Sequence, residues 1–143
     1  KWLQIMQAYE QGGHAYHATP PTDALVALRK AMSEAEAHGF EKLRVAQTEL
    51  GAKVRALLAQ RGFRSVAAPG FEAPGVVVCY TDDAEIHSGR KFAALGLQTA
   101  AGVPLQCDEP ADFRSFRIGL FGLDKLYAVD RTVATLARAL DRL

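Results

Sequence analysis

The chain has 143 residues, of which 49% are hydrophobic, so it is long enough and apolar enough to bury the core of one domain. Its formal net charge is +1 and its basic residues are spread along the sequence, which argues against nucleic acid as a partner. The longest apolar stretches are too short to cross a membrane, and Cys79 and Cys107 have neither the spacing of a metal site nor that of a disulfide framework. We therefore expect a cytoplasmic protein without a bound metal, a nucleic-acid partner or a membrane partner.

The first forty residues are predicted to form two helices joined by a loop. Apolar side chains recur every three or four positions up to the glycine pair at 12 and 13, which should end the first helix. Residues 14–21 lack this periodicity and end in two prolines, so they should form a loop. The next helix should begin at Thr22 or Asp23, whose side chains can cap it, and stop at Gly39.

A longer helix is predicted over residues 41–61, because Gly62 follows a sustained helical pattern. Its apolar side chains lie on one face, and that face should be buried. The members of this predicted stripe are Leu43, Ala46, Leu50, Val54 and Leu57.

From residue 63 onwards the pattern favours β-strands. Residues 63–67 read as a short strand, and the β-branched run at 76–80 as a central strand buried on both faces. A brief edge strand is expected at 98–101, and a further strand at 115–120. These strands should pair in a small, largely antiparallel sheet.

Two more helices are expected in this half. One should be capped by Asp82 or Asp83 and run to about Leu95, and the final one should start at Asp124. The stripe of the final helix consists of Leu126, Val129, Val133, Leu136, Leu140 and Leu143. The predicted fold is therefore α/β of the α+β type, with helices packed on one face of the sheet.

Arg117 is a single cation inside an apolar strand, between Phe116 and Ile118. Burying a guanidinium beside apolar side chains is costly unless an anion meets it. Because its planar fork matches a carboxylate, a small carboxylic acid is one predicted partner. The alternative is an arginine whose stem lies on the sheet while its head reaches solvent or an internal aspartate.

Tyr16 and Thr19 lie three residues apart in the predicted loop, and both carry a hydroxyl. In a turn, two such hydroxyls can converge on one phosphate group. The alternative is that they satisfy nearby backbone groups or bind water, as threonine often does in turns.

Two segments of the chain carry a resemblance to a known family. The segment from Phe116 to Gly122, with Arg117-Ile118-Gly119 inside it, resembles the C-terminal end of class V pyridoxal-phosphate (PLP) aminotransferases. This group contains the alanine–glyoxylate and serine–pyruvate aminotransferases. The segment from Tyr16 to Pro21 resembles a second motif of the family, in the same order and about a hundred residues earlier. The resemblance covers nearly the whole chain.

The resemblance implies a fold, a domain division and a dimer. Residues 1–40 would be the tail of the large PLP-binding domain, and residues 41–143 the C-terminal small domain of a fold-type I PLP enzyme, bridged by the helix at 41–61. Arg117 would hold the α-carboxylate of the substrate. Tyr16 and Thr19 would contact the PLP phosphate of the neighbouring subunit, so a homodimer with shared active sites is expected.

The implied function is an aminotransferase that moves an amino group between a small amino acid (alanine, serine or aspartate) and glyoxylate or pyruvate. Such an enzyme needs a lysine upstream of the tyrosine motif to form the Schiff base with PLP. The only lysine ahead of Tyr16 is Lys1, so this chain contains no catalytic residue and is expected to be inactive alone. The alternative is a non-catalytic α/β module that binds a small carboxylic acid through Arg117.

Overall fold

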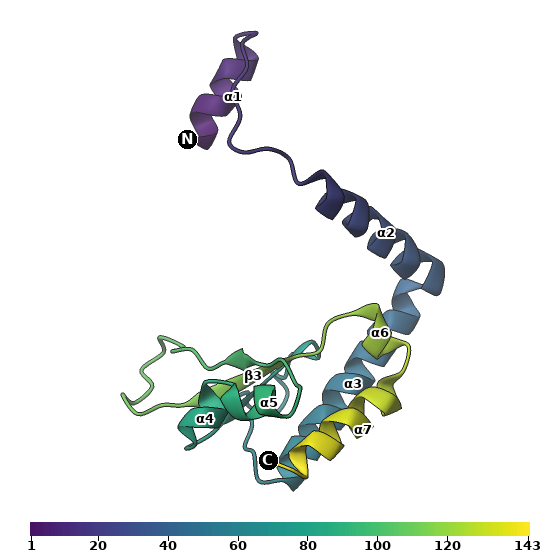
Figure 1. Ribbon diagram of the computed structural model, residues 1–143, viewed down its shortest axis with the longest axis vertical. Coiled ribbons are helices and arrows are strands. Elements are labelled where there is room, and N and C mark those ends of the chain that lie inside the picture. Colours follow the sequence, from purple (N-terminus) through teal and green to yellow (C-terminus); the bar gives the residue numbers. More distant parts are fainter. The chain divides into compact units, whose positions relative to one another are not determined.

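The computed structural model describes all 143 residues, and these form two compact units, Lys1–Ala37 and His38–Leu143. The first unit contains α1 (Trp2–Glu10), the loop that follows it, and most of α2 (Thr22–His38) (Figure 1). Neither helix contains a buried residue. Thr22 is the first residue of α2 itself, so the predicted capping by Thr22 or Asp23 is wrong, and two prolines precede the helix.

The second unit combines helices with one small sheet. The helices are α3 (Phe40–Gln60), α4 (Ala84–His87), α5 (Arg90–Ala94), α6 (Leu123–Leu126) and α7 (Val129–Leu140). The strands are β1 (Val76–Tyr80), β2 (Ala100–Ala101) and β3 (Ser115–Gly119), in the antiparallel order β1-β3-β2. The long helices α3 and α7 pack side by side (Figure 1).

One face of the sheet carries the core. The register pairs Val77 with Ile118 and Cys79 with Phe116, and all four side chains are buried. Because side chains alternate along a strand, the residues between them point to the other face. The sheet therefore has one apolar face and one face that carries both apolar and polar side chains, here called the mixed face.

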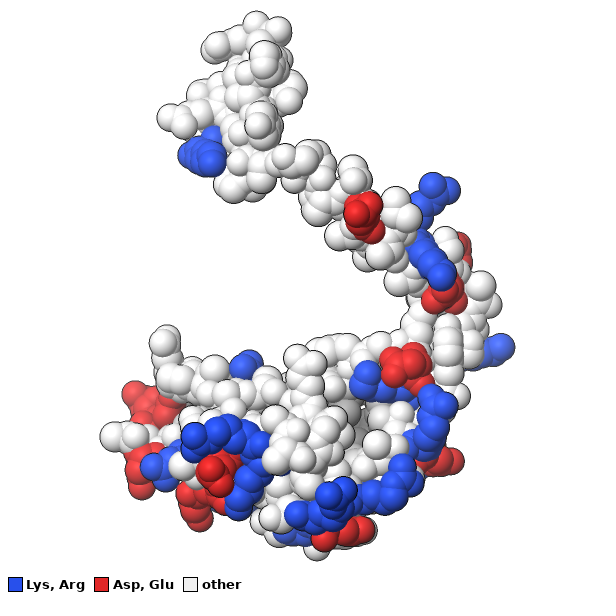
Figure 2. All heavy atoms as spheres, in the orientation of Figure 1, with Lys and Arg blue, Asp and Glu red and all other residues white.

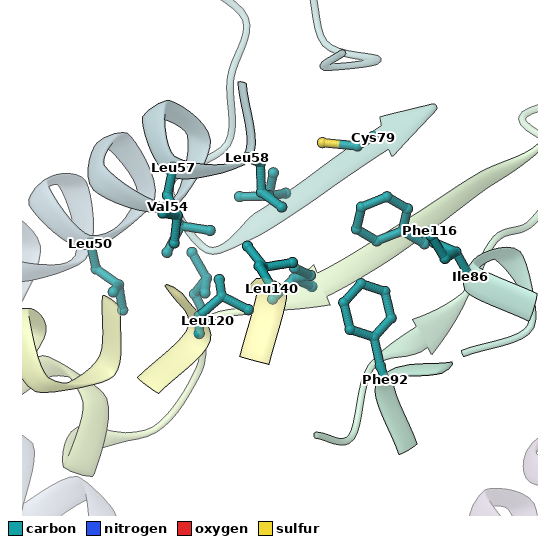
Figure 3. Close-up of a cluster of buried hydrophobic side chains, with 13 residues drawn as sticks. Leu50, Val54, Leu57, Leu58, Cys79, Ile86, Phe92, Phe116, Leu120 and Leu140 are labelled. Carbon is teal, nitrogen blue, oxygen red and sulfur yellow. The ribbon is translucent and has the colours of Figure 1, made fainter. Parts of the chain in front are cut away.

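Helices cover the apolar face, as Figure 3 shows for the side chains of the core. Leu50, Val54 and Leu58 of α3 are fully buried there. Phe116 meets Phe92 of α5 at a ring-centroid distance of 5.3 Å and meets Phe63 edge-on at 5.1 Å. The predicted fold, a small antiparallel sheet with helices on one face, is confirmed.

The buried stripe of α3 follows the prediction closely. Leu43, Leu50, Val54 and Leu57 are buried, while Ala46 is only half-buried. In the last part of the chain the predicted stripe also packs on the core, either buried or partly buried. Helical periodicity therefore predicted which side chains of these helices face the core.

Two predictions about the strands are wrong. β1 lies at one edge of the sheet, and its burial alternates, because only Val77 and Cys79 point into the core. Residues 63–67 form a single bridge, Ser65 with Cys79, rather than a strand. This segment still covers the outer edge of β1, where the Val66 N–H donates to the Val78 carbonyl at 2.9 Å. A continuous β-branched run does not distinguish a central strand from an edge covered in this way.

Two predicted helices are each divided in two. The helix expected between Asp83 and Leu95 breaks at Gly89, whose φ of 80° lies in the left-handed region. The helix expected from Asp124 onwards is interrupted at Ala128, whose backbone is not helical, so α6 and α7 are separate. The predicted cap at Asp83 is confirmed, since its carboxylate accepts from the Glu85 N–H at 2.7 Å.

Gly51 allows α3 to approach the loop before β1. A Cβ at this position would lie 2.7 Å from the carbonyl oxygen of Pro74. We expect Gly51→Ala to lower the free energy of unfolding by about 1–3 kcal/mol, the usual cost of overpacking a tight contact. Helix propensity alone would give the opposite sign, a gain of about 1 kcal/mol.

Thermal or denaturant unfolding measures this effect, and exposed Ala52→Gly on the same helix serves as the propensity control. A Gly51→Ala variant that unfolds at a higher temperature than the parent would show that the contact with Pro74 does not limit the packing of α3.

Candidate functional site

Arg117 occupies the middle of β3, on the face opposite to the core. Phe116 and Ile118, its neighbours in sequence, are buried, whereas Arg117 is half-exposed. In the register its cross-strand neighbours are Val78 of β1 and Ala100 of β2. The small side chain of Ala100 leaves space beside the arginine stem. The strand thus anchors the stem of Arg117 and leaves its head on the mixed face.

The head of Arg117 is held by one hydrogen bond within the chain. Its Nε donates to the carbonyl oxygen of Ala101 at 2.9 Å. No carboxylate of the chain forms an ion pair with its guanidinium, although seven other basic residues have such partners. The internal aspartate considered as an alternative is therefore absent. The terminal nitrogens of Arg117 are therefore free to bind the two oxygens of one carboxylate.

The loop with Tyr16 and Thr19 lies in the first unit and folds back on α1. The imidazole of His17 stacks on the indole of Trp2, with ring centroids 4.7 Å apart and planes 6° from parallel. Together the helix and the loop enclose a shallow cavity of about 390 Å³, which Tyr16 and Thr19 both line. The stacking partner of His17 was not predicted, because Trp2 reads as an ordinary member of an apolar helix face.

Tyr16 and Thr19 are both exposed residues, Tyr16 to 71%, and the hydroxyl of neither forms a hydrogen bond within the chain. The surroundings are almost uncharged, since Lys1 and Glu10 are the only charged residues among the first 21. In Figure 2 the visible face of α1 and this loop is white apart from one basic group. Two free hydroxyl donors fit the oxygens of a phosphate group. They would form only part of a PLP site.

Tyr16 and Thr19 belong to the first unit and Arg117 to the second. Each group is therefore described within its own unit.

A groove of about 750 Å³ lies elsewhere on the second unit, at the end of the sheet where β3 begins. The guanidinium of Arg64 lies over the ring of Tyr80, 4.2 Å from its centroid, and Phe113 meets Tyr80 edge-on at 5.7 Å. Arg114 also lines the groove, whereas Arg117 does not. The sequence carries no signal for this groove, because its residues come from three separate segments.

The loop beside this groove is organised by one carboxylate. Glu109 accepts from the backbone N–H groups of Leu105 at 2.5 Å, Gln106 at 2.8 Å and Cys107 at 2.8 Å. These backbone hydrogen bonds, that of Cys107 foremost, lower the pKa of the Glu109 carboxyl to about 2.

Removing the charge of Glu109 should therefore loosen the loop at residues 105–107. Because the folded-state pKa lies below the ordinary 4.5, this carboxylate stabilises the loop fully above about pH 4.5, and the effect is lost as the pH falls towards about 2. We expect Glu109→Gln at neutral pH to raise amide hydrogen exchange at these residues, with Glu72→Gln as an exposed control. Unchanged exchange in Glu109→Gln would show that the carboxylate does not order the loop.

The remaining candidates for chemistry are few. Burial raises the pKa of the Cys79 thiol to about 11, while Cys107 is exposed on the loop. The structure brings no three His, Cys, Asp or Glu side chains together in a way that would hold a metal ion. None of its helices has the length and apolar character needed to span a membrane.

No family model matches the chain. It is 29% identical, over 146 aligned residues, to a 2-aminoethylphosphonate–pyruvate transaminase from Burkholderia ambifaria (strain MC40-6), covering 99% of this chain and 38% of that protein. It also resembles the crystal structure of an aspartate aminotransferase of subgroup IV from Thermus thermophilus, with a TM-score of 0.60, 20% identity, and coverage of 99% of this chain and 38% of the other.

These matches confirm the predicted resemblance to class V aminotransferases. The structural match, at its low sequence identity, shows the fold. The chain spans 38% of the length of each of these relatives.

Proposed function

We propose, from the resemblance of this chain to class V transaminases along 99% of its length, that it is part of a PLP-dependent aminotransferase. The observation that carries the proposal is Arg117, whose head is oriented by Ala101 and has no carboxylate partner within the chain. An arginine left unpaired on a sheet suits an anionic substrate that arrives from solution.

In this proposal Arg117 binds the carboxylate of the substrate through its two terminal nitrogens. The bond from Nε to the Ala101 carbonyl restricts rotation of the guanidinium, so less rotational freedom is lost when the substrate binds. The substrate's α-carbon is then held in one place relative to the sheet. Positioning of this kind is the main contribution that a protein makes around such a cofactor.

Tyr16 and Thr19 would bind the phosphate of PLP with their free hydroxyls. PLP supplies, when bound, an electron sink for negative charge at the α-carbon of the substrate. The proton transfer at that carbon needs a lysine that this chain lacks upstream of Tyr16, apart from Lys1. The chain is therefore proposed to be inactive by itself, and finding a lysine-bearing domain upstream in the gene would separate this proposal from a stand-alone carboxylate-binding module.

The proposed domain assignment follows the prediction from the sequence. Residues 1–40 would belong to the large PLP-binding domain, residues 41–143 would form the small C-terminal domain, and the helix at 41–61 would bridge them. Tyr16 and Thr19 would act on the cofactor of the partner subunit in a homodimer, whereas Arg117 would act within its own subunit.

The proposed amino donors are alanine, serine and aspartate, and the name of the Burkholderia relative adds 2-aminoethylphosphonate to the compounds worth assaying. The proposed acceptors are glyoxylate and pyruvate. Both acceptors carry a carboxylate, and a phosphonate is also an anion that arginine binds with two oxygens. Because both acceptors carry the carboxylate that Arg117 is proposed to bind, the contribution of Arg117 is best measured as kcat/KM for the acceptor.

Arg117→Ala in the complete protein should lower kcat/KM for pyruvate by the equivalent of about 2–5 kcal/mol, because the carboxylate loses its charged partner. Arg117→Lys should restore little of this, since an ammonium group lacks the planar fork. Arg114→Ala replaces an exposed arginine directly before β3, serves as the matched control, and should leave kcat/KM for pyruvate close to that of the parent. If steady-state kinetics give Arg117→Ala the same kcat/KM for pyruvate as the parent, Arg117 does not bind the substrate.

Mixed dimers test whether Tyr16 acts across the subunit interface. Arg117→Ala and a disruptive Tyr16→Asp should each inactivate the complete protein. If Tyr16 acts in trans, a heterodimer of the two variants has one site with both lesions and one site with neither. A fully exchanged mixture should then regain about one quarter of the parent activity, since about half of the dimers are mixed and each has one intact site.

The readout is transaminase activity after subunit exchange, with exchange verified by two different affinity tags. Activity that stays at the level of the separate variants would mean that Tyr16 acts on the cofactor of its own subunit, or not at all.

A further inference from the structure

The carbonyl that orients Arg117 belongs to a very short strand. β2 contains only Ala100 and Ala101, which pair with Arg117 and Phe116 of β3. It is an edge strand, so no other strand supports its outer side. Two residues of pairing fix a strand weakly, and the position of the Ala101 carbonyl depends on what holds the end of β2.

His87 forms two hydrogen bonds at that point, one with the residue after β2 and one with the first residue of β3. Its backbone carbonyl accepts from the N–H of Gly102, the residue after β2, at 3.1 Å. Its ring Nδ1 lies 2.8 Å from the carbonyl oxygen of Ser115, the first residue of β3. Because a carbonyl oxygen only accepts, Nδ1 carries the proton. His87 therefore connects the end of β2 to the beginning of β3, directly beyond the last strand pair.

The space around this connection is closely packed. A Cβ on Gly102 would lie 2.0 Å from the Ser115 carbonyl oxygen and 2.6 Å from Nδ1 of His87. Ser115 is buried and His87 is half-buried. The ring is thus held between two backbone segments and has no room to shift without moving β2.

The helix that carries His87 is itself well anchored. His87 is the last residue of α4, and its backbone N–H donates to the carbonyl of Asp83 at 2.9 Å. The Asp83 carboxylate caps α4 and binds Nζ of Lys91 in α5 at 2.5 Å. A rigid helix end therefore presents His87 to the sheet.

We propose that His87 is a positioning residue for Arg117, which acts by fixing the end of β2 and with it the Ala101 carbonyl that orients the guanidinium. The inference rests on the proposed function, in which Arg117 binds the substrate carboxylate. His87 does not touch the substrate. Both the neutral ring with its proton on Nδ1 and the charged ring provide the required donor.

Kinetics of the complete protein with pyruvate as acceptor test the proposal. We expect His87→Ala to raise the KM for pyruvate about three- to tenfold, the effect of one lost hydrogen bond. His87→Asn should restore most of the affinity, because its side-chain N–H donor lies close to where Nδ1 lies in histidine. The matched control is Ser88→Ala at the same helix end, whose hydroxyl donates to the Glu85 carbonyl at 3.2 Å, and its KM should be unchanged.

A double variant separates positioning from general destabilisation. Arg117→Lys has no Nε to bind the Ala101 carbonyl, so adding His87→Ala to it should raise the KM no further. The role of His87 would be overturned if His87→Ala raised the KM for pyruvate equally in the parent and in Arg117→Lys. It would also be overturned if His87→Ala and His87→Asn raised that KM by the same factor.

The single variants also separate this inference from the proposed function. If Arg117→Ala leaves the KM for pyruvate unchanged, the proposed role of Arg117 fails, and the inference fails with it. If Arg117→Ala raises the KM but His87→Ala does not, Arg117 remains the carboxylate-binding residue and only the role of His87 is overturned.

Discussion

The alternation of side chains along β3 is the constraint on which the second unit depends. Phe116 and Ile118 point into the core and fix the strand against the helices, so Arg117 between them must point to the opposite face. A shift of the register by one residue would bury the guanidinium and expose both apolar side chains, at a large cost in free energy. The same packing that stabilises the unit therefore holds the arginine on the mixed face of the sheet.

Much of this arrangement could be predicted from the sequence, because helical periodicity and capping act locally. The stripe of α3 and the cap at Asp83 are examples. The strand order could not be predicted, since a β-branched run fits either an edge or the centre of a sheet. The break at Gly89 uses the left-handed backbone conformation that glycine permits, whereas the break at Ala128 falls at a residue that usually favours helices, so the local pattern did not predict it.

Some residues of the candidate site could be predicted from the sequence, and others could not. Arg117 stood out in the sequence because a charge interrupts an apolar strand, and Tyr16 with Thr19 stood out through the resemblance to a family. His87 and Gly102 gave no such signal, because their contact joins a helix end to a strand end that lie fifteen residues apart in the sequence. The first unit buries no residue of its own helices. The assignment of residues 1–40 to a larger domain stays a proposal.

The role of Arg117 can be seen directly in a crystal structure of the complete protein with its cofactor and pyruvate bound. We expect the two carboxylate oxygens of pyruvate to lie within hydrogen-bond distance of the terminal nitrogens of Arg117, while Nε remains bound to the Ala101 carbonyl. A pyruvate carboxylate bound by a different cation, with Arg117 directed into solvent, would contradict it.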